Sequence, residues 1–135
     1  MSRVPNALVV SSNDELRKEL ADTLRHYGMR PLLASSVVQG LCVLSDHPIN
    51  IVFCEDRLID GDYLHFVDGV KRIAPRVPLV VLTQAFDINE RAIALTSGVL
   101  EYAKVVPGGR HCGLGRGPGK ISKLLLEEQH LVAKP

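Results

Sequence analysis

The sequence predicts an α/β fold in which a parallel sheet is covered by helices on both faces. Two observations predict it: five short apolar runs recur along the first hundred or so residues, and segments with helical apolar spacing separate them. Short apolar runs are typical of strands buried on both faces, as strands are in parallel sheets. Right-handed crossovers between such strands give a doubly wound sandwich.

The five predicted strands lie at regular intervals along the chain. They comprise residues 7–10, 31–34, 51–54, 78–82 and 99–103. The third run is the most informative, because Glu55 and Asp56 follow it directly. In open α/β sheets, functional residues gather at the carboxyl ends of the strands. This acid pair is therefore the first candidate site.

Four helices are predicted between the strands. Ser12 and Asp87 each precede a glutamate by three residues, a capping-box pattern that predicts a helix N-cap at both positions. The second helix is predicted to start at Ser36 and to end before Pro48, because a proline disfavours helical backbone at the residue before it. The apolar stripes of the first three helices comprise Leu16, Leu20, Leu24 and Tyr27, then Val37, Leu41 and Leu44, then Tyr63, Phe66, Val67 and Val70. Gly28 and Gly98 are placed to end the first and fourth helices.

Composition narrows the class of protein. A chain of 135 residues with 46% hydrophobic residues is expected to form one domain with a sizeable core. Its 16 basic and 15 acidic side chains give a net charge of +1, which favours neither nucleic acid nor a membrane surface as a partner. No apolar run approaches the ~20 residues of a membrane span. Three cysteines without metal-ligand spacing favour reduced thiols and a cytoplasmic location.

The last part of the chain departs from this regular pattern. Residues 107–119 are rich in glycine and basic residues and contain no acid, which predicts a flexible loop. Residues 120–132 have apolar residues at helical spacing and predict a final amphipathic helix. The expected organisation of residues 1–135 is thus a single domain with its core at residues 7–106.

Four local matches make residues 7–106 resemble a response-regulator receiver domain, the (βα)5 module of two-component signalling. Residues 9–17 resemble the first strand and its acidic-pair turn, and residues 55–62 resemble the phosphoacceptor turn. Thr83 resembles the switch hydroxyl that ends the fourth strand, and Tyr102 resembles the switch aromatic of the fifth. The resemblance implies a flavodoxin-like, CheY-like sheet with strand order 2-1-3-4-5.

The same resemblance implies that other residues replace the catalytic residues of the family in this chain. Active receivers hold Mg²⁺ with two acids after the first strand, where this chain has Ser11 and Ser12. Hydroxyls are poor substitutes for the carboxylates that a hard divalent ion prefers, so we expect the Mg²⁺ site to be lost and no cofactor to bind. The phosphoacceptor position holds Glu55, and the family's lysine position holds Val105. Lys104 is adjacent, but a shift of one residue turns a strand side chain to the opposite face.

Alternatives remain at each position. Glu55 imitates the phosphorylated state in one interpretation, although its charge of −1 is below the roughly −1.5 to −2 of a phosphate; in the other it is an ordinary solvated carboxylate. A register shifted by one residue would make Asp56 the phosphoacceptor instead. Thr83 is expected to hydrogen-bond Glu55, or else only to cap its own loop. Tyr102 either rotates between buried and exposed positions or is a plain core-edge aromatic.

The sequence thus predicts an atypical receiver that works as a phosphorylation-independent interaction module and not as an enzyme. The expected partners are another protein or an output domain, bound through the fourth helix, fifth strand and fifth helix, with a homodimer or a histidine kinase as further possibilities. Direct contact with nucleic acid or a membrane is not expected. The alternatives are a conventional receiver phosphorylated at Asp56 or Glu55, and a small flavodoxin-like enzyme or nucleotide binder.

Overall fold

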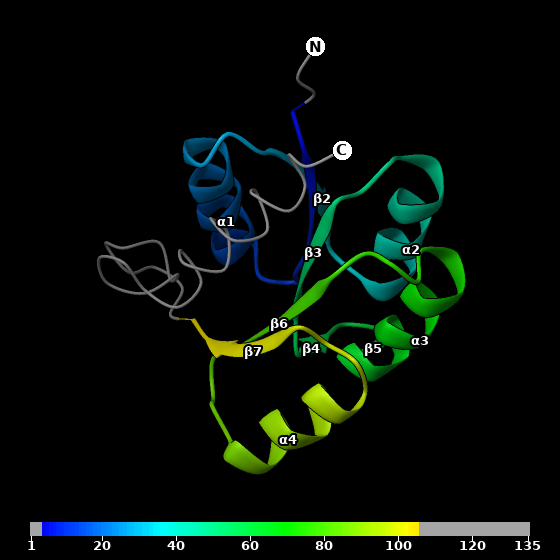
Figure 1. Cartoon of the computed structure of the whole chain (residues 1–135). Helices are drawn as coiled ribbons and strands as arrows, with labels where there is room; N and C mark the ends of the chain where they lie inside the picture. Colours follow the sequence, from blue (N-terminus) through cyan, green and yellow to red (C-terminus); the bar gives the residue numbers. More distant parts are fainter. Residues whose placement is uncertain (1–3, 106–135) are drawn as a thin grey trace.

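A five-stranded parallel sheet forms the centre of the molecule. The computed structural model describes residues 4–105 (Figure 1). The sheet order is β2-β1-β3-β6-β7. Its strands are β1 (Asn6–Val10), β2 (Arg30–Ala34), β3 (Ile51–Glu55), β6 (Leu79–Thr83) and β7 (Glu101–Lys104). Counting only the strands of this sheet, the order is 2-1-3-4-5, so the predicted fold and topology are confirmed.

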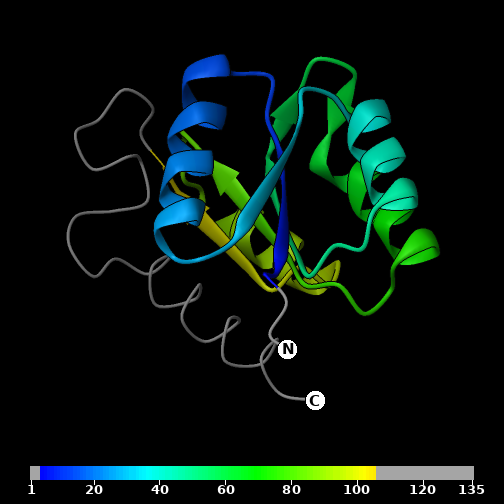
Figure 2. The same cartoon turned by 90° about the horizontal axis from the view of Figure 1, so that it is seen from above.

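Helices cover both faces of the sheet. They are α1 (Asp14–His26), α2 (Val37–Asp46), α3 (Tyr63–Ile73) and α4 (Ile88–Thr96). Figure 2 shows α1 on one side of the sheet and α2 and α3 on the other. Ala94 of α4 belongs to the same buried cluster as residues of α2 and α3, so α4 covers that second face as well.

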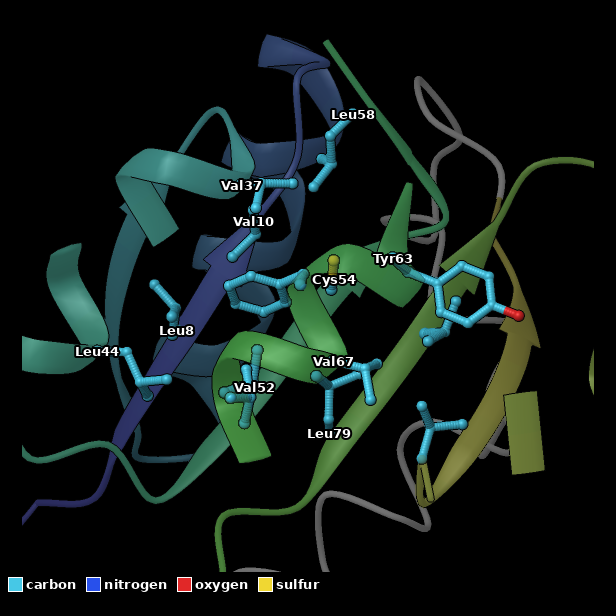
Figure 3. Close-up of a cluster of buried hydrophobic side chains, with 14 of the residues drawn as sticks. Leu8, Val10, Val37, Leu44, Val52, Cys54, Leu58, Tyr63, Val67 and Leu79 are labelled. Carbon is cyan, nitrogen blue, oxygen red and sulfur yellow. The ribbon is translucent and has the colours of Figure 1, made fainter. Parts of the chain in front are cut away.

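Two apolar layers fill the space between the sheet and its helices. Successive residues of β1 alternate between them, because strand side chains point to opposite faces in turn. Leu8 and Val10 join the layer under α2 and α3, part of which Figure 3 shows. Ala7 and Val9 join the layer under α1. This alternation continues to the strand ends and assigns each site residue to a face.

A short antiparallel hairpin follows β3 and was not predicted. It pairs β4 (Arg57–Leu58) with β5 (Gly61–Asp62). Gly61 has a φ of 154°, a backbone conformation that L side chains rarely adopt. Asp62 then caps α3, and its carboxylate accepts from the N–H groups of Leu64 and His65. Residues 57–62, within the segment that resembles the phosphoacceptor turn, therefore form a hairpin that ends in a helix cap.

Several element boundaries differ from the predictions. The predicted N-cap Ser12 is wrong: Asn13 caps α1, and its side-chain oxygen accepts from the N–H of Leu16. The fifth strand of the sheet begins at Glu101 and not at residue 99. The other caps agree with the sequence, since Ser36 begins α2 and Asp87 begins α4.

The two predictions for the last part of the chain fall outside the described residues. The loop at residues 107–119 and the helix at residues 120–132 both lie beyond residue 105. Within residues 4–105, no helix is long and apolar enough to cross a membrane.

Candidate functional site

Glu55 and Asp56 lie at the carboxyl end of β3 and point to opposite faces of the sheet. Phe53 belongs to the layer under α1, so Glu55, two residues later, faces α1. Asp56 follows and faces the side of α3 and α4. The Glu55 residue is only 8% exposed, whereas Asp56 is intermediate. The structure thus separates two acids that are adjacent in the sequence into two different environments.

Both carboxylate oxygens of Glu55 accept hydrogen bonds. The hydroxyl of Ser11, at the end of β1, donates to Oε1 over 2.7 Å. The side-chain amide of Gln84, just after β6, donates to Oε2 over 2.9 Å. Hydrogen bonds to an ionised carboxylate are stronger than those between neutral groups, so this pair of donors compensates Glu55 for its burial. The predicted site residues Ser11 and Glu55 are therefore in direct contact.

Thr83 bonds to Asp56, and not to Glu55 as the sequence suggested. Its hydroxyl lies 3.0 Å from Oδ2 of Asp56. The sheet register explains this correction. Glu55 pairs with Leu82 of β6, so Thr83 is one residue further along and lies on the opposite face, where Asp56 is.

Tyr102 is buried on the same face as Thr83. It is 1% exposed, and its ring packs against Phe86 with centroids 5.3 Å apart. The ring is therefore buried in the layer under α2 and α3. Rotation of this ring to an exposed position stays a prediction.

The residue predicted to stand at the family's lysine position, Val105, is buried. Val105 is 1% exposed and belongs to the layer under α1, the face to which Glu55 points. Lys104 is exposed and pairs in register with Thr83. Strand alternation thus directs the Lys104 side chain away from the face of Glu55, as its offset of one residue predicts.

Ser11 and Ser12 both take part in hydrogen bonds with other parts of the chain. The Ser12 hydroxyl donates to the carbonyl of Ser35 over 2.8 Å and accepts from the N–H of Ile59 over 3.0 Å. It joins the loop before α1 to the loop before α2 and to the hairpin. Two neutral hydroxyls that are already bonded fit Mg²⁺ poorly. Among residues 4–105, no group of three or more His, Cys, Asp or Glu side chains is placed to hold a metal ion.

Sequence reasoning missed two residues of this region. Gln84 matches no motif, and only the fold brings it to Glu55. Asp60 lies in the hairpin turn, where its carboxylate accepts from the N–H groups of Val37 and Val38 at the start of α2 over 2.7 and 3.1 Å. These two backbone hydrogen bonds lower the pKa of Asp60 from its usual 3.8. A lone acid in a turn gives no sign that it caps a helix more than twenty residues earlier.

The chain is similar in sequence to transcriptional and regulatory proteins of bacteria. No family model matches it. It is 28% identical over 98 residues to the photosynthetic apparatus regulatory protein RegA of Rhodovulum sulfidophilum, covering 73% of this chain and 54% of that one. It is 26% identical over 97 residues to the KDP operon transcriptional regulatory protein KdpE of Escherichia coli, covering 72% and 43%. The match to the transcriptional regulatory protein ZraR of Klebsiella oxytoca covers only 18% of that protein. The chain thus spans at most about half the length of these relatives.

Solved structures share the fold of the described residues. A CheY-like response regulator receiver domain protein from Methanospirillum hungatei JF-1 superposes with a TM-score of 0.76 at 16% identity, covering 96% of this chain and 99% of that one. The beryllofluoride-activated NtrC4 receiver domain dimer gives a TM-score of 0.73 at 19% identity, covering 93% of both chains. At this level of identity the solved structures establish the fold alone. The described residues therefore have the fold of CheY-like receiver domains, and the chain is similar in sequence to bacterial regulatory proteins.

Proposed function

We propose that this chain is a cytoplasmic receiver domain that signals through protein contacts without accepting a phosphoryl group. The observation that carries the proposal is the state of Glu55. This carboxylate occupies the phosphoacceptor position, and each of its oxygens accepts a hydrogen bond from a side chain of the same molecule. Phosphoryl transfer to a carboxylate needs a nucleophilic oxygen aligned with the leaving group and a metal that neutralises the charge.

The groups around Glu55 support the same conclusion. Ser12 binds neighbouring loops, and Val105 has no charge to offer at the lysine position. Without a Mg²⁺ ion and without the lysine, the electrostatic stabilisation on which phosphoryl transfer depends would be absent. Under this proposal, Glu55 stabilises one conformation of the strand ends and does not react with a phosphoryl donor.

The working surface that we propose is formed by α4 and β7, together with the helix predicted at residues 120–132. On α4 and the loop before it, Phe86 is 45% exposed, Ile88 67% and Ile93 48%. A shallow depression lined by Ala92, Ile93, Thr96 and Ser97 lies on the same helix. Exposed large apolar side chains that gather in one region can mark protein-interaction sites, and these three lie within eight residues of the chain. The partner would be an output domain, a histidine kinase or a second copy of the chain.

Phosphate uptake tests the proposal directly. The protein is incubated with acetyl phosphate and Mg²⁺, and its intact mass is measured at neutral pH and again after mild acid. The expected result is an unchanged mass, with an active receiver as the positive control. A stoichiometric, acid-labile phosphate adduct would contradict the proposal.

One observation favours a second candidate, a conventional receiver phosphorylated at Asp56. Its carboxylate is partly accessible, and Thr83, in the switch position of the family, bonds to it. The variants Asp56→Asn and Glu55→Gln separate the two candidates. If an adduct forms on the wild type and on Glu55→Gln but not on Asp56→Asn, the second candidate replaces the first.

A further inference from the structure

We propose that Gln84 is a positioning residue that holds the β6–α4 loop in one arrangement by binding Glu55. Beside the backbone hydrogen bond from Asp56 to Leu82, two side-chain contacts join the end of β3 to the end of β6: Glu55 with Gln84 on the α1 face, and Asp56 with Thr83 on the opposite face. We call these two contacts the clasp. This inference rests on the proposed function, because it identifies what fixes the loop when no phosphoryl group is present.

The two contacts of the clasp restrain the loop from both sides of the sheet. Glu55 ends β3 and Asp56 follows it, while Thr83 ends β6 and Gln84 follows it. Because neighbouring side chains point to opposite faces, the contact of Glu55 with Gln84 lies on one face and that of Asp56 with Thr83 on the other. A single contact would leave the loop free to pivot about it. Two contacts on opposite faces remove that freedom and fix the direction in which the chain leaves β6.

Gln84 makes up for a donor that the fifth strand of the sheet does not provide. Val105 lies in the layer under α1, the face of Glu55, and its side chain cannot donate a hydrogen bond. A buried carboxylate with an unsatisfied oxygen is unfavourable, so a donor from another element stabilises it. Gln84 is that donor, and unlike a residue of β7 it belongs to the loop that leads into α4.

The clasp determines where α4 begins. The Thr83 hydroxyl also accepts from the N–H of Ala85 over 3.1 Å, which turns the chain sharply after β6. Phe86 then packs on Tyr102, and Asp87 caps α4. The positions of the exposed apolar residues of α4 therefore depend on the two acids at the end of β3.

Amide hydrogen exchange, read residue by residue by NMR, tests the role of Gln84. The sensitive amides are those of Ala85 and Val105, which bond to the hydroxyl and the carbonyl of Thr83. In Gln84→Ala we expect exchange at both to be roughly fivefold faster than in the wild type, the equivalent of one ordinary hydrogen bond. Asn89→Ala, which removes an exposed amide in the first turn of α4, is the matched control and should leave both rates within about twofold.

A swap of the two side chains makes the test specific. Gln84→Glu places a second carboxylate against Glu55. In this variant the amides of Ala85 and Val105 should exchange faster than in Gln84→Ala, because like charges repel. The double variant Glu55→Gln with Gln84→Glu restores an amide–carboxylate pair, and its rates should return to within about threefold of the wild type.

Each outcome has a distinct meaning. If Gln84→Ala exchanges no faster than Asn89→Ala, Gln84 does not position the loop and the inference fails. The same holds if the double variant exchanges as fast as Gln84→Glu, since the repulsion would then not arise at Glu55. Phosphate uptake by the wild type, measured separately by mass, would overturn the proposed function and leave the exchange result to stand by itself.

Discussion

The two halves of the carboxyl edge of the sheet are built in different ways. In the first half, the loops that follow β1, β2 and β3 bind one another: Ser12 reaches two of them, and Asp60 caps α2 from the hairpin. In the second half, Ala94 is the only buried residue of α4, whereas α3 has four buried residues. Polar contacts hold α4 in place, from Tyr63 to Glu90 and from Arg91 to Glu101.

This difference indicates which half is the frame and which half can adapt. Segments with little buried apolar area open at a lower free energy than well-packed ones. The first half is therefore the more rigid part, which we call the frame, and in it Ser12 and Asp60 link neighbouring loops. Both halves expose apolar side chains, Val38 and Ile59 in the first and Ile88 and Ile93 in the second. The second half, with less buried apolar area, is the one that we propose as the contact surface.

The largest expected effect is the loss of packing in the frame. Phe66 of α3 is fully buried and packs against Gly40 of α2, where an added Cβ would lie 2.9 Å from the ring. Phe66→Ala should lower the free energy of unfolding by about 3–5 kcal/mol, measured by urea denaturation. A loss below about 1 kcal/mol would show that the first half is no better packed than the second.

A smaller effect is expected where the two halves meet. The Tyr63 hydroxyl donates to Oε2 of Glu90 over 2.9 Å, and Tyr63→Phe should lower the free energy of unfolding by about 1 kcal/mol. Exchange of the α4 amides should quicken more than that of the α1 amides. Uniform acceleration in both helices would contradict the view that this contact secures α4 in particular.

Tyr63 also gives the contact a pH dependence. Burial first, and then the hydrogen bond to Glu90, raise the pKa of Tyr63 above its usual 10.0. Because the folded value is the higher one, the contribution is fully present below about pH 10 and is lost as the pH rises toward the folded value. Urea denaturation above about pH 10 should therefore show a steeper decline for the wild type than for Tyr63→Phe.

The stability contributed by Asp60, in the exposed turn of the hairpin, should depend on pH. The pKa of Asp60 is lowered, so its stabilising contribution is present above the usual value of 3.8 and disappears as the pH falls through the folded value. Asp60→Asn should be less stable than the wild type at neutral pH, and the difference should shrink at about pH 3. A difference that is independent of pH would assign the effect to shape and not to charge.

The smallest effect on stability is expected on the outer side of α4. Ile93 is 48% exposed, and Ile93→Ser should change the free energy of unfolding by no more than about 0.5 kcal/mol. If the chain forms homodimers through this surface, sedimentation velocity should show weaker association of the variant. Destabilisation by more than about 1 kcal/mol would mean that Ile93 belongs to the core and not to a contact surface.

The sheet could be predicted from the sequence because its three inner strands β1, β3 and β6 are buried on both faces. Each of these three is a run of apolar residues followed by polar ones, and this pattern located Glu55 and Thr83 at the strand ends. The offset of Lys104 from the lysine position could also be predicted, since strand alternation is strict.

The hydrogen-bond partners could not be predicted in the same way. Ser12 and Asn13 are both good capping residues, and the local pattern favoured Ser12. The hydroxyl of Ser12 is instead bonded to Ile59, 47 residues away, which no local pattern reveals. Gln84 was missed for the same reason, because its partner is 29 residues away.

The bonds of Ser12 set a cost for building a metal site at this position. In the substitution Ser12→Asp, the carboxylate would present a negative charge to the carbonyl of Ser35, to which the serine hydroxyl donates. The substitution would thus weaken the contact between these two loops before it supplied any metal ligand. Stability of the loop frame and magnesium binding therefore make opposite demands on residue 12.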